Sequence, residues 1–470
     1  MKWVALTVLG LIVALGSAAA VPSPAVIRVR YTAADQERSR YAYVPFTVPP
    51  GTTRITLAYR YDRAGGENAV DFGVYEPGSL DIGTKALRGW SGGARDTIEI
   101  GVADASPGYW PGALPPGEWH AVLGLYKVAP GGVDVEMTVE YSHVAAAALP
   151  ELRRATTSPV RQGPHWYMGV LHAHTVHSDG ELTPEQLVRK AAAEHLDFVA
   201  ITDHNNTTHQ REVPSAPGLL VITGEEVTTP VGHFNVWGLG GARDDVDFRL
   251  NGEPRVFDRV MRGVRDRGAV ISINHPVSDC LACSWTGRVP EAVGAIEIAN
   301  GPPDARRQAL LVWDTLLRTG RRLTAVDGSD WHRGTAPLAQ PAVRVWATEL
   351  STAAVLDALR RGRVVVLADG TLPAPELVAE AGGNRAMVGD TLAVTPGSAV
   401  EISLRAAPDS YSDARVDIRW NGEVVSRAPL GTGQVTTTRH PTSAGYVRAQ
   451  LVDRIGTLLA VTNPVYITLR

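Results

Sequence analysis

The alternation of hydrophobic and polar residues divides the chain into three parts. Between about residues 21 and 144, short alternating runs such as TRITLAYRY and VDVEMTVEY are separated by turn-forming stretches such as PPGTT and LPPGE. This pattern predicts an N-terminal all-β sandwich or jelly-roll domain. Residues 371–470 repeat the pattern, in runs such as AVEISLRA and AGYVRAQLV. They predict a C-terminal immunoglobulin-like β-sandwich.

The middle part has a different pattern, which follows an expected linker at residues 145–164. Between 165 and 370, apolar runs such as DFVAITDH and AVISINHP predict buried strands, and amphipathic stretches between them predict helices. The clearest helix start is Thr183, which precedes Pro184 and Gln186 in the spacing of a capping box. Repeated strand–helix units predict a parallel sheet, and seven or eight of them predict a TIM-like (β/α)7–8 barrel. The expected fold class is therefore α/β, with a barrel between two β domains.

Residues 1–20 have the layout of a secretory signal peptide. Lys2 precedes an apolar run, and small residues end the segment at Ala18–Ala20. The alternative is a retained membrane anchor, but the apolar run is shorter than the roughly 20 residues that span a bilayer. We therefore expect a secreted or extracytoplasmic protein from a bacterium, with no transmembrane segment after cleavage.

The composition limits the possible functions of the chain. Hydrophobic residues make up 44% and charged residues 20% of the 470 residues, which is typical of globular proteins. The net charge of −4 provides no basic surface for nucleic acid, so no nucleic-acid partner is expected. Cys280 and Cys283 are the two cysteines. In an exported chain they are expected to form a local disulfide, with a redox role as the alternative.

Histidines and carboxylates gather at the ends of the predicted strands. Ten of the thirteen histidines lie between His165 and His332. The residues that end predicted strands are His172, His174, Asp203, His204, Glu225, Glu226, His275, Asp330 and His332; Asp179 follows in the turn after the first strand, and His233 opens the fourth. Because the strand ends of a parallel barrel meet on one face, these side chains are expected to converge there. Burying so many polar groups requires a counter-charge, which divalent cations supply, and mixed imidazole and carboxylate ligands favour Zn, Mn or Fe.

Six motifs in this region closely resemble those of the polymerase and histidinol phosphatase (PHP) family. They are LHAHTVHSDG, ITDHNN, GEEVTT, GHFNVWGL, INHP and GSDWH, in this order, and the resemblance covers about Trp166 to Asp369. The flanking β domains and the secretion signal are most similar to the carbaryl-hydrolase-type branch of the family. The resemblance implies a distorted PHP barrel that holds two or three divalent ions.

The resemblance also implies which residues bind each ion. The first set is His172, His174, Glu226 and Asp330; the second is Asp179, His204 and His332; the third is Glu226, His233 and His275, with Glu226 bridging. Two positions remain ambiguous. The family pattern selects Glu226, so its neighbour Glu225 is expected to point away. Some members have a histidine where this chain has Asp179, so His177 is kept as a loop or substrate-facing residue.

The ligands imply hydrolysis by a metal-bridging hydroxide, with no other catalytic side chain. Asp203 and Asn274 each neighbour a ligand and are candidates for orienting imidazoles, or are ordinary strand-end caps. Arg333 is a candidate for binding an anionic substrate, or is a solvated loop residue. His177 and Asn205 complete the weaker candidates for substrate binding.

Three functions remain open at this point. The first is a phosphoesterase that acts on phosphate mono- or diesters, and the second is a carboxylic ester or carbamate hydrolase. The third is an exported glycan- or surface-binding protein with structural metals, whose β domains contact a carbohydrate or a cell surface. The aromatic residues Trp90, Tyr109, Trp110 and Trp119 line a sugar-binding face in that interpretation. Otherwise they fill a core or a domain interface.

Overall fold

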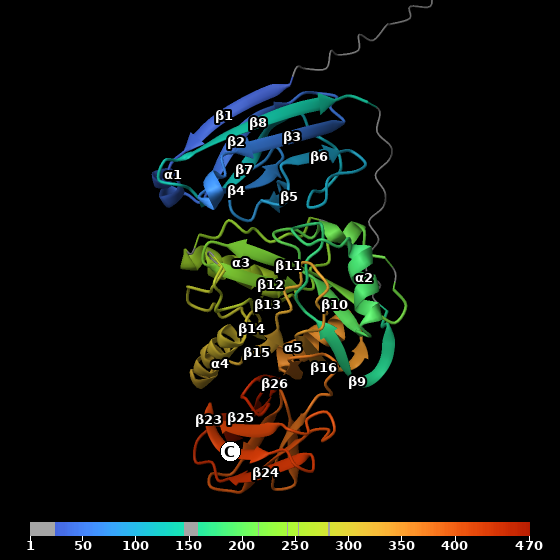
Figure 1. Cartoon of the computed structure of the whole chain (residues 1–470), viewed down its shortest axis with the longest axis vertical. Coiled ribbons are helices and arrows are strands. Elements are labelled where there is room, and N and C mark those ends of the chain that lie inside the picture. Colours follow the sequence, from blue (N-terminus) through green and yellow to red (C-terminus); the bar gives the residue numbers. More distant parts are fainter. Residues whose placement is uncertain (1–23, 145–157, 215, 242, 252, 281–282) are drawn as a thin grey trace, which may run out of the picture.

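The structure is a computed structural model that describes residues 24–144, 158–214, 216–241, 243–251, 253–280 and 283–470. Its N-terminal, central and C-terminal parts follow one another along the long axis of the molecule (Figure 1). The predicted signal peptide and residues 145–157 of the expected linker lie outside the described residues. Within the described ranges, no helix combines the length and apolarity needed to cross a membrane.

The N-terminal part consists of two four-stranded antiparallel sheets, in the orders β1-β8-β3-β6 and β2-β7-β4-β5. Its elements are β1 (Ala25–Tyr31), α1 (Ala33–Arg38), β2 (Tyr41–Val48), β3 (Arg54–Tyr61), η1 (Ala64–Gly66), β4 (Ala69–Tyr75), β5 (Leu87–Gly92), β6 (Thr97–Gly101), β7 (Gly117–Lys127) and β8 (Val133–Ser142). Alternate residues of β4, such as Val70 and Phe72, enter the core between the sheets. The opposite face of the second sheet is therefore directed away from this core.

The central part is built on one mixed sheet in the order β15-β14-β13-β12-β11-β10-β9-β16-β17. Its strands are β9 (Arg161–Val170), β10 (Phe198–Ile201), β11 (Leu220–Thr229), β12 (Gly232–Trp237), β13 (Val270–Ile273), β14 (Ala295–Ala299), β15 (Thr324–Asp327), β16 (Ala342–Leu350) and β17 (Val364–Leu367). Its helices are α2 (Pro184–Ala193), η2 (Thr208–Arg211), α3 (Pro254–Asp266), α4 (Pro303–Arg318) and α5 (Thr352–Arg361). Helix α2 begins at the predicted capping box of Thr183 and Gln186.

The sheet differs from the all-parallel barrel that the strand–helix pattern predicts. Strand β12 is antiparallel to both β11 and β13, and β16 is antiparallel to both β9 and β17. Only Pro230 and Val231 separate β11 from β12, and a connection this short joins antiparallel strands. Four α-helices accompany the nine strands in the described residues, so the fold is mixed α/β and a TIM barrel is not shown. Strand β9 also begins at Arg161, inside the range expected to be linker.

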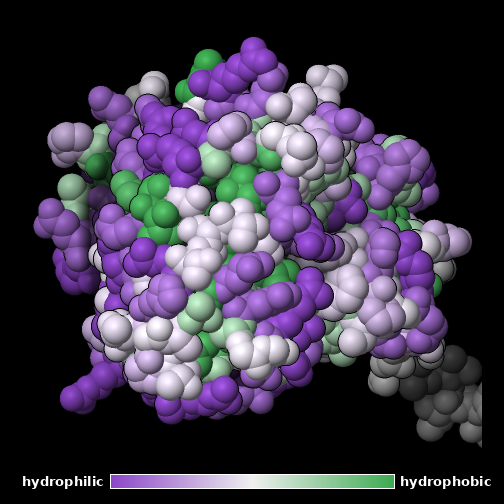
Figure 2. Space-filling view, turned by 90° about the horizontal axis from the view of Figure 1, so that it is seen from below, coloured by the Kyte–Doolittle hydropathy of each residue, from purple (hydrophilic) through white to green (hydrophobic). Residues whose placement is uncertain are grey.

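The C-terminal part continues the central sheet. Strand β17 pairs with β26, and the sheet extends through β25 and β22 to β23, with β27 paired to β25 and β20. A second sheet, β19-β18-β21-β24, covers it. The strands are β18 (Glu376–Ala381), β19 (Asn384–Met387), β20 (Thr391–Val394), β21 (Val400–Arg405), β22 (Arg415–Trp420), β23 (Glu423–Pro429), β24 (Gln434–Arg439), β25 (Gly445–Val452), β26 (Leu458–Thr462) and β27 (Val465–Leu469). Seen from this end, the surface is mostly hydrophilic and its hydrophobic residues form small, separate groups (Figure 2).

The outer face of the sheet β2-β7-β4-β5 packs on the central part. The rings of Trp90 and Phe248 have centroids 4.4 Å apart, and Arg249 Nη1 donates a hydrogen bond to Tyr43 Oη at 2.7 Å. The Nε1 of Trp110 donates a hydrogen bond to Asp245 Oδ2 at 2.9 Å. This dense contact fixes the sandwich over one edge of the central sheet.

The four aromatic residues considered for a sugar-binding face are all buried. Tyr109 and Trp119 lie in the core of the N-terminal sandwich, and Trp90 and Trp110 lie between the two parts of the molecule. They therefore form no exposed aromatic surface. Their role is to pack the core and the interface.

Candidate metal centre

Nine predicted metal ligands converge at one edge of the central sheet. His172, His174 and Asp179 follow β9; His204 follows β10; Glu226 lies in β11 and His233 in β12; His275 follows β13; Asp330 and His332 follow β15. The antiparallel direction of β12 matters here, because His233 stands near the beginning of its strand. A parallel β12 would place that residue at the opposite edge.

Four of these side chains, those of His172, His174, Glu226 and Asp330, form a compact group of ligand atoms. The two Nε2 atoms lie 3.0 Å apart, and they lie 3.3 and 3.2 Å from Asp330 Oδ1. Each Nε2 also lies 3.3 Å from Glu226 Oε2. Ligand atoms about 2.0–2.2 Å from one tetrahedral ion are separated by about 3.3–3.6 Å. The group therefore has the size of a single-ion site.

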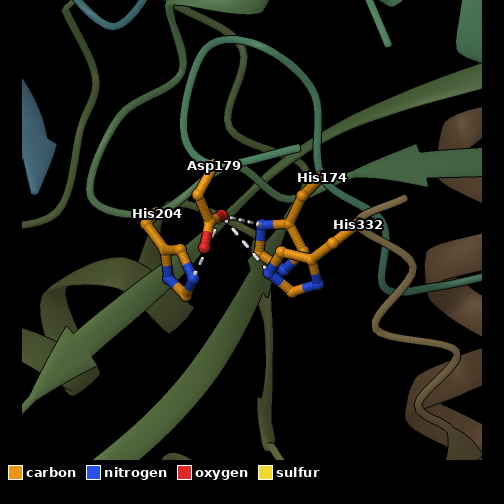
Figure 3. Close-up of side chains that lie close together, drawn as sticks. All are labelled: His174, Asp179, His204 and His332. Atoms are coloured by element: carbon orange, nitrogen blue, oxygen red, sulfur yellow. Dashed lines mark ion pairs between the residues drawn. The ribbon is translucent and has the colours of Figure 1, made fainter. Parts of the chain in front are cut away.

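A second group surrounds Asp179. Its Oδ1 lies 3.2 Å from His332 Nε2, 3.7 Å from His204 Nε2 and 4.0 Å from His174 Nδ1. Figure 3 shows the three imidazoles turned toward this carboxylate. The group matches the predicted second set, with His174 as a neighbour that it shares with the first group.

Glu226 lies between the groups and uses both of its oxygens. Oε2 faces the first group and lies 3.0 Å from His204 Nδ1, whereas Oε1 lies 3.2 Å from His233 Nδ1 and 3.0 Å from His275 Nε2. A third compact group in the described residues contains His204, Glu226 and His233. His275, predicted for this set, contacts Glu226 but is not in that group. A carboxylate with histidines at both oxygens is suited to bridging neighbouring ions.

Hydrogen bonds on the far side of the rings hold three imidazoles with Nε2 toward the centre. The Nδ1 of His172 lies 2.6 Å from Glu297 Oε1, that of His174 lies 3.3 Å from Ser178 Oγ, and that of His332 lies 2.7 Å from its neighbour's carbonyl oxygen, Asp330 O. With the proton on Nδ1 in each ring, Nε2 presents a lone pair.

Glu297 is a residue that the sequence analysis missed. It is fully buried in β14, accepts a hydrogen bond from the amide of His275 at 2.7 Å and orients His172. Gly328 makes room for it, because a Cβ at that position would collide with Glu297 Oε2. The sequence feature that could have identified Glu297 is its place as the one carboxylate in the apolar run AIEIA. A charged residue in a buried strand needs a buried partner.

Asp203 and Asn274 have supporting positions that differ from those expected. Asp203 accepts hydrogen bonds from the Thr175 amide at 2.8 Å and from Ser178 Oγ at 2.7 Å, so it fixes the loop that supports His174. Asn274 donates a hydrogen bond from Nδ2 to Glu226 Oε1 at 3.0 Å. Neither contacts the imidazole of the histidine next to it through a described hydrogen bond.

The three candidates for substrate binding lie in different surroundings. His177 is buried in the loop after β9, with Nδ1 2.7 Å from Thr208 Oγ1, and it is not among the residues that line the cavity over the centre. Asn205 accepts a hydrogen bond from the Thr228 amide at 2.8 Å, and Thr228 Oγ1 lies 2.6 Å from His204 Nδ1. Arg333 is exposed and lines the cavity.

Glu225 points away from the centre, as expected. Its Oε2 accepts a hydrogen bond from the amide of Val246 at 2.8 Å. Burial and repulsion by Asp245 raise the pKa of Glu225 well above its usual range. Cys280 and Cys283 form a disulfide, with Cα atoms 5.5 Å apart, in the loop after His275.

The buried carboxylates of the centre are stable as anions only beside positive charge. Burial raises the pKa of Glu226, but His172 and His204 outweigh it and hold this pKa well below its usual range. Burial lowers the pKa of His174, yet Asp330 and Glu226 raise it to about 10. Protonated imidazoles thus provide the charge that divalent cations would otherwise provide, so the residues fit such ions.

The backbone around the centre is strained at three residues. Asn205, His275 and Asp330 adopt positive φ angles of 54°, 24° and 52°, which non-glycine residues rarely do. Such conformations persist where surrounding structure enforces them, and they are concentrated at functional sites. The strain is consistent with ligands held in place before an ion binds.

A cavity of about 410 Å³ opens over the centre. Its floor includes Asp179, His204 and His233, and Arg333 lies at its side. Its other wall comes from the N-terminal sandwich and includes Asp71, Trp90 and Tyr126. A cavity of this size accommodates a small substrate above the ligands.

Comparison with known proteins identifies the segment that carries most of these ligands. Residues 171–235 match the PHP domain family. Two curated relatives, the 5'-3' exoribonucleases Rnm of Salmonella typhimurium and Escherichia coli, are each 45% identical to this chain over 64 residues. That stretch is 13% of this chain and only 22% of the length of each relative.

Two solved structures have a more distant likeness. A two-domain protein from Bacteroides vulgatus, containing a predicted PHP-like metal-dependent phosphoesterase, is 18% identical, with 68% of this chain and 100% of that chain covered and a TM-score of 0.36. An amidohydrolase from Chromobacterium violaceum is 19% identical, with 36% and 92% covered and a TM-score of 0.23. The segment that contains His172, His174, Asp179, His204, Glu226 and His233 is thus the segment that matches the PHP domain.

Proposed function

We propose that this protein is a metal-dependent phosphoesterase that hydrolyses phosphate mono- or diesters. The observation that carries the proposal is the compact group of His172, His174, Glu226 and Asp330. Through Glu226 it adjoins His204, which lines a cavity. The match to the PHP domain and the similarity to exoribonucleases over 64 residues support a phosphoester as the substrate.

The side chains have separable roles in this function. Two or three divalent ions, Zn, Mn or Fe, would activate a water for attack and polarise the phosphoryl oxygen. The three ligand groups would hold them, with Glu226 shared. Glu297 and Ser178 keep His172 and His174 in the ligating tautomer, and Arg333 is placed to bind a substrate oxygen at the cavity edge.

We also infer that the protein acts outside the cytoplasm of a bacterium. The support is the signal-peptide pattern of residues 1–20. A small phosphoester, rather than a nucleic acid, is the proposed substrate because the net charge is −4. A position in the carbaryl-hydrolase-type branch, with its barrel and two flanking β domains, belongs to the same proposal.

The test compares bonds that share one leaving group. The chain from residue 21 onward, loaded with Mn or Zn, is assayed on p-nitrophenyl phosphate, on bis-p-nitrophenyl phosphate, and on a p-nitrophenyl carboxylic ester and carbamate. A short RNA oligonucleotide forms a separate arm. His172→Ala removes a ligand, and His165→Ala is the matched control, because His165 is an exposed histidine on β9, the strand that precedes His172.

We expect hydrolysis of a phosphate ester that His172→Ala lowers by more than about 100-fold and His165→Ala leaves unchanged. Hydrolysis of the carboxylic ester or carbamate alone would overturn the proposal in favour of a carbaryl-type activity. Inactivity on every substrate, with metal bound at full stoichiometry, would favour the glycan- or surface-binding alternative.

A further inference from the structure

The N-terminal sandwich forms a wall of the cavity above the metal centre. The strands β4, β5 and β7 lie on the side of the sandwich that faces the central part (Figure 1). Asp71 from β4, Trp90 from β5 and Tyr126 from β7 line the same cavity as Asp179 and His204. The β domain is therefore part of the site rather than a distant appendage.

The alternation of β4 determines where Asp71 points. Val70, Phe72 and Val74 enter the core of the sandwich, whereas Tyr75 packs in the core of the central part. Asp71 is four residues before Tyr75 on the strand, so both side chains point to the same face of the sheet. That face is the one that covers the metal centre. A polar residue at this position of an alternating strand resembles an ordinary surface residue in the sequence.

Small residues stand beside the carboxyl of Asp71. Gly92 and Gly93 line the cavity beside it, and a Cβ on Gly93 would stand only 3.6 Å from Asp71 Oδ1. Among the described residues, no side chain or amide donates a hydrogen bond to this carboxyl. Burial and repulsion by Asp179 raise the pKa of Asp71 to about 7. A carboxyl in this state holds a proton near neutral pH and can release it to a bound group.

We infer that Asp71 is a catalytic residue that donates a proton to the leaving oxygen of the substrate. The inference rests on the proposed phosphoesterase function. As water adds to phosphorus, the bond between phosphorus and the leaving oxygen breaks, and that oxygen takes the proton of Asp71. The attacking water loses one proton to solvent, and solvent restores the proton of Asp71, so the net reaction consumes one water.

Other charged groups face the same space. From the central part, the cavity is lined by Asp179, His204, His233 and Arg333. From the sandwich, Tyr126 lines the cavity and an adjoining recess, and Arg40 lines that recess. These groups act on every substrate that reacts at the centre. The role of Asp71 therefore has to be tested by a ratio between two substrates rather than by one rate.

The test uses Asp71→Asn, which keeps the size of the side chain but cannot donate an acidic proton. Phenyl and p-nitrophenyl esters are compared, within whichever phosphate series the wild-type metal-loaded protein hydrolyses. Asp134→Asn is the matched control, because Asp134 is an exposed aspartate on β8 of the same sandwich. Circular dichroism and metal content verify that each variant is folded and loaded.

We expect Asp71→Asn to lower kcat/KM for the phenyl ester by about 100-fold or more, because phenolate is a poor leaving group without a proton. The p-nitrophenyl ester, whose leaving group needs little help, should lose less than about 5-fold. Equal losses on both esters, or no loss on either, would overturn the inference. Wild-type inactivity on both would instead refute the proposed function.

A wild-type measurement covers the case in which Asp71→Asn fails to fold. The ratio of phenyl to p-nitrophenyl hydrolysis is measured between pH 6 and 9, since ionised Asp71 cannot donate. The ratio should fall as pH rises, whereas titration of groups that serve both substrates leaves it constant. A flat ratio would contradict the role of Asp71.

Discussion

The orientation of a ligand in the centre depends on the hydrogen bonds that its side chain makes away from the other ligands. The Nε2 of His172 faces the group of ligands because its Nδ1 meets Glu297 at 2.6 Å. Glu297 is fully buried and also accepts a hydrogen bond from the backbone amide of His275. One carboxylate thus orients the side chain of one strand end and the main chain of another.

Glu297→Gln should weaken metal binding while the fold is kept. The amide can still accept a hydrogen bond from His172, but it lacks the charge that raises the basicity of the imidazole, so we expect the Kd to rise by about 10–100-fold. Competition with a chromogenic zinc chelator measures this change. Glu291→Gln, at an exposed glutamate before the same strand, should bind metal as the wild type does. An unchanged Kd for Glu297→Gln would exclude this role.

At the scale of the elements, pairs across strands stabilise the β domains. Asp417 on β22 stands opposite Arg427 on β23, and its Oδ1 accepts a hydrogen bond from Arg427 Nε at 2.9 Å and from Arg415 Nε at 3.2 Å. Burial raises the pKa of Asp417, but these arginines outweigh burial and lower it. Stability from this pair is present above the unfolded pKa of about 3.9, and is lost as pH falls through the folded value.

Asp417→Asn should therefore destabilise the protein in a pH-dependent manner. At pH 7 we expect the free energy of unfolding to drop by about 1–3 kcal/mol, because a buried charged hydrogen bond is lost. The difference from the wild type should shrink below about pH 4. Urea unfolding in the presence of a chelator measures it at several pH values, and Asp409→Asn, at an exposed aspartate, serves as the control. A difference that does not vary with pH would contradict this account.

At the scale of the whole molecule, β17 joins two cores. Val364 and Val366 pack in the central core, whereas Val365 and Leu367 pack in the C-terminal core. A second connection is buried between α4 and β25, where Arg448 Nε donates a hydrogen bond to Asp314 Oδ1 at 2.8 Å. The C-terminal sandwich therefore completes the central part.

Removal of residues 371–470 should leave the central part unable to fold as a soluble monomer. Truncation would expose one apolar face of β17 and the edge that pairs with β26, and both promote aggregation. Size-exclusion chromatography with light scattering should detect aggregates or no soluble protein, whereas the chain lacking only residues 1–20 should be monodisperse. A soluble truncated monomer with the wild-type melting temperature would show that the two cores are independent.

The local features of this protein follow from the order of its residues alone. The four helices of the central part and the capping box at Thr183 follow from nearest-neighbour chemistry, and the structure confirms them. The convergence of the ligands at one edge was also predictable, because strand-end positions are visible in the pattern and strand ends meet at one edge of a sheet. The particular set of His172, His174, Glu226 and Asp330 came from the resemblance to the PHP family.

The pairing of the strands and the meeting of distant residues depend on how the whole chain packs. Strand direction depends on connections and neighbours, so a run of apolar residues could not show that β12 and β16 are antiparallel. Glu297 resembles an ordinary buried-strand residue in the sequence, and its contact with His172, 125 positions away, arises only in the fold. Asp71 resembles a surface residue, and only the fold brings it to the same cavity as Asp179. Such contacts depend on packing between parts of the molecule, which the local pattern does not encode.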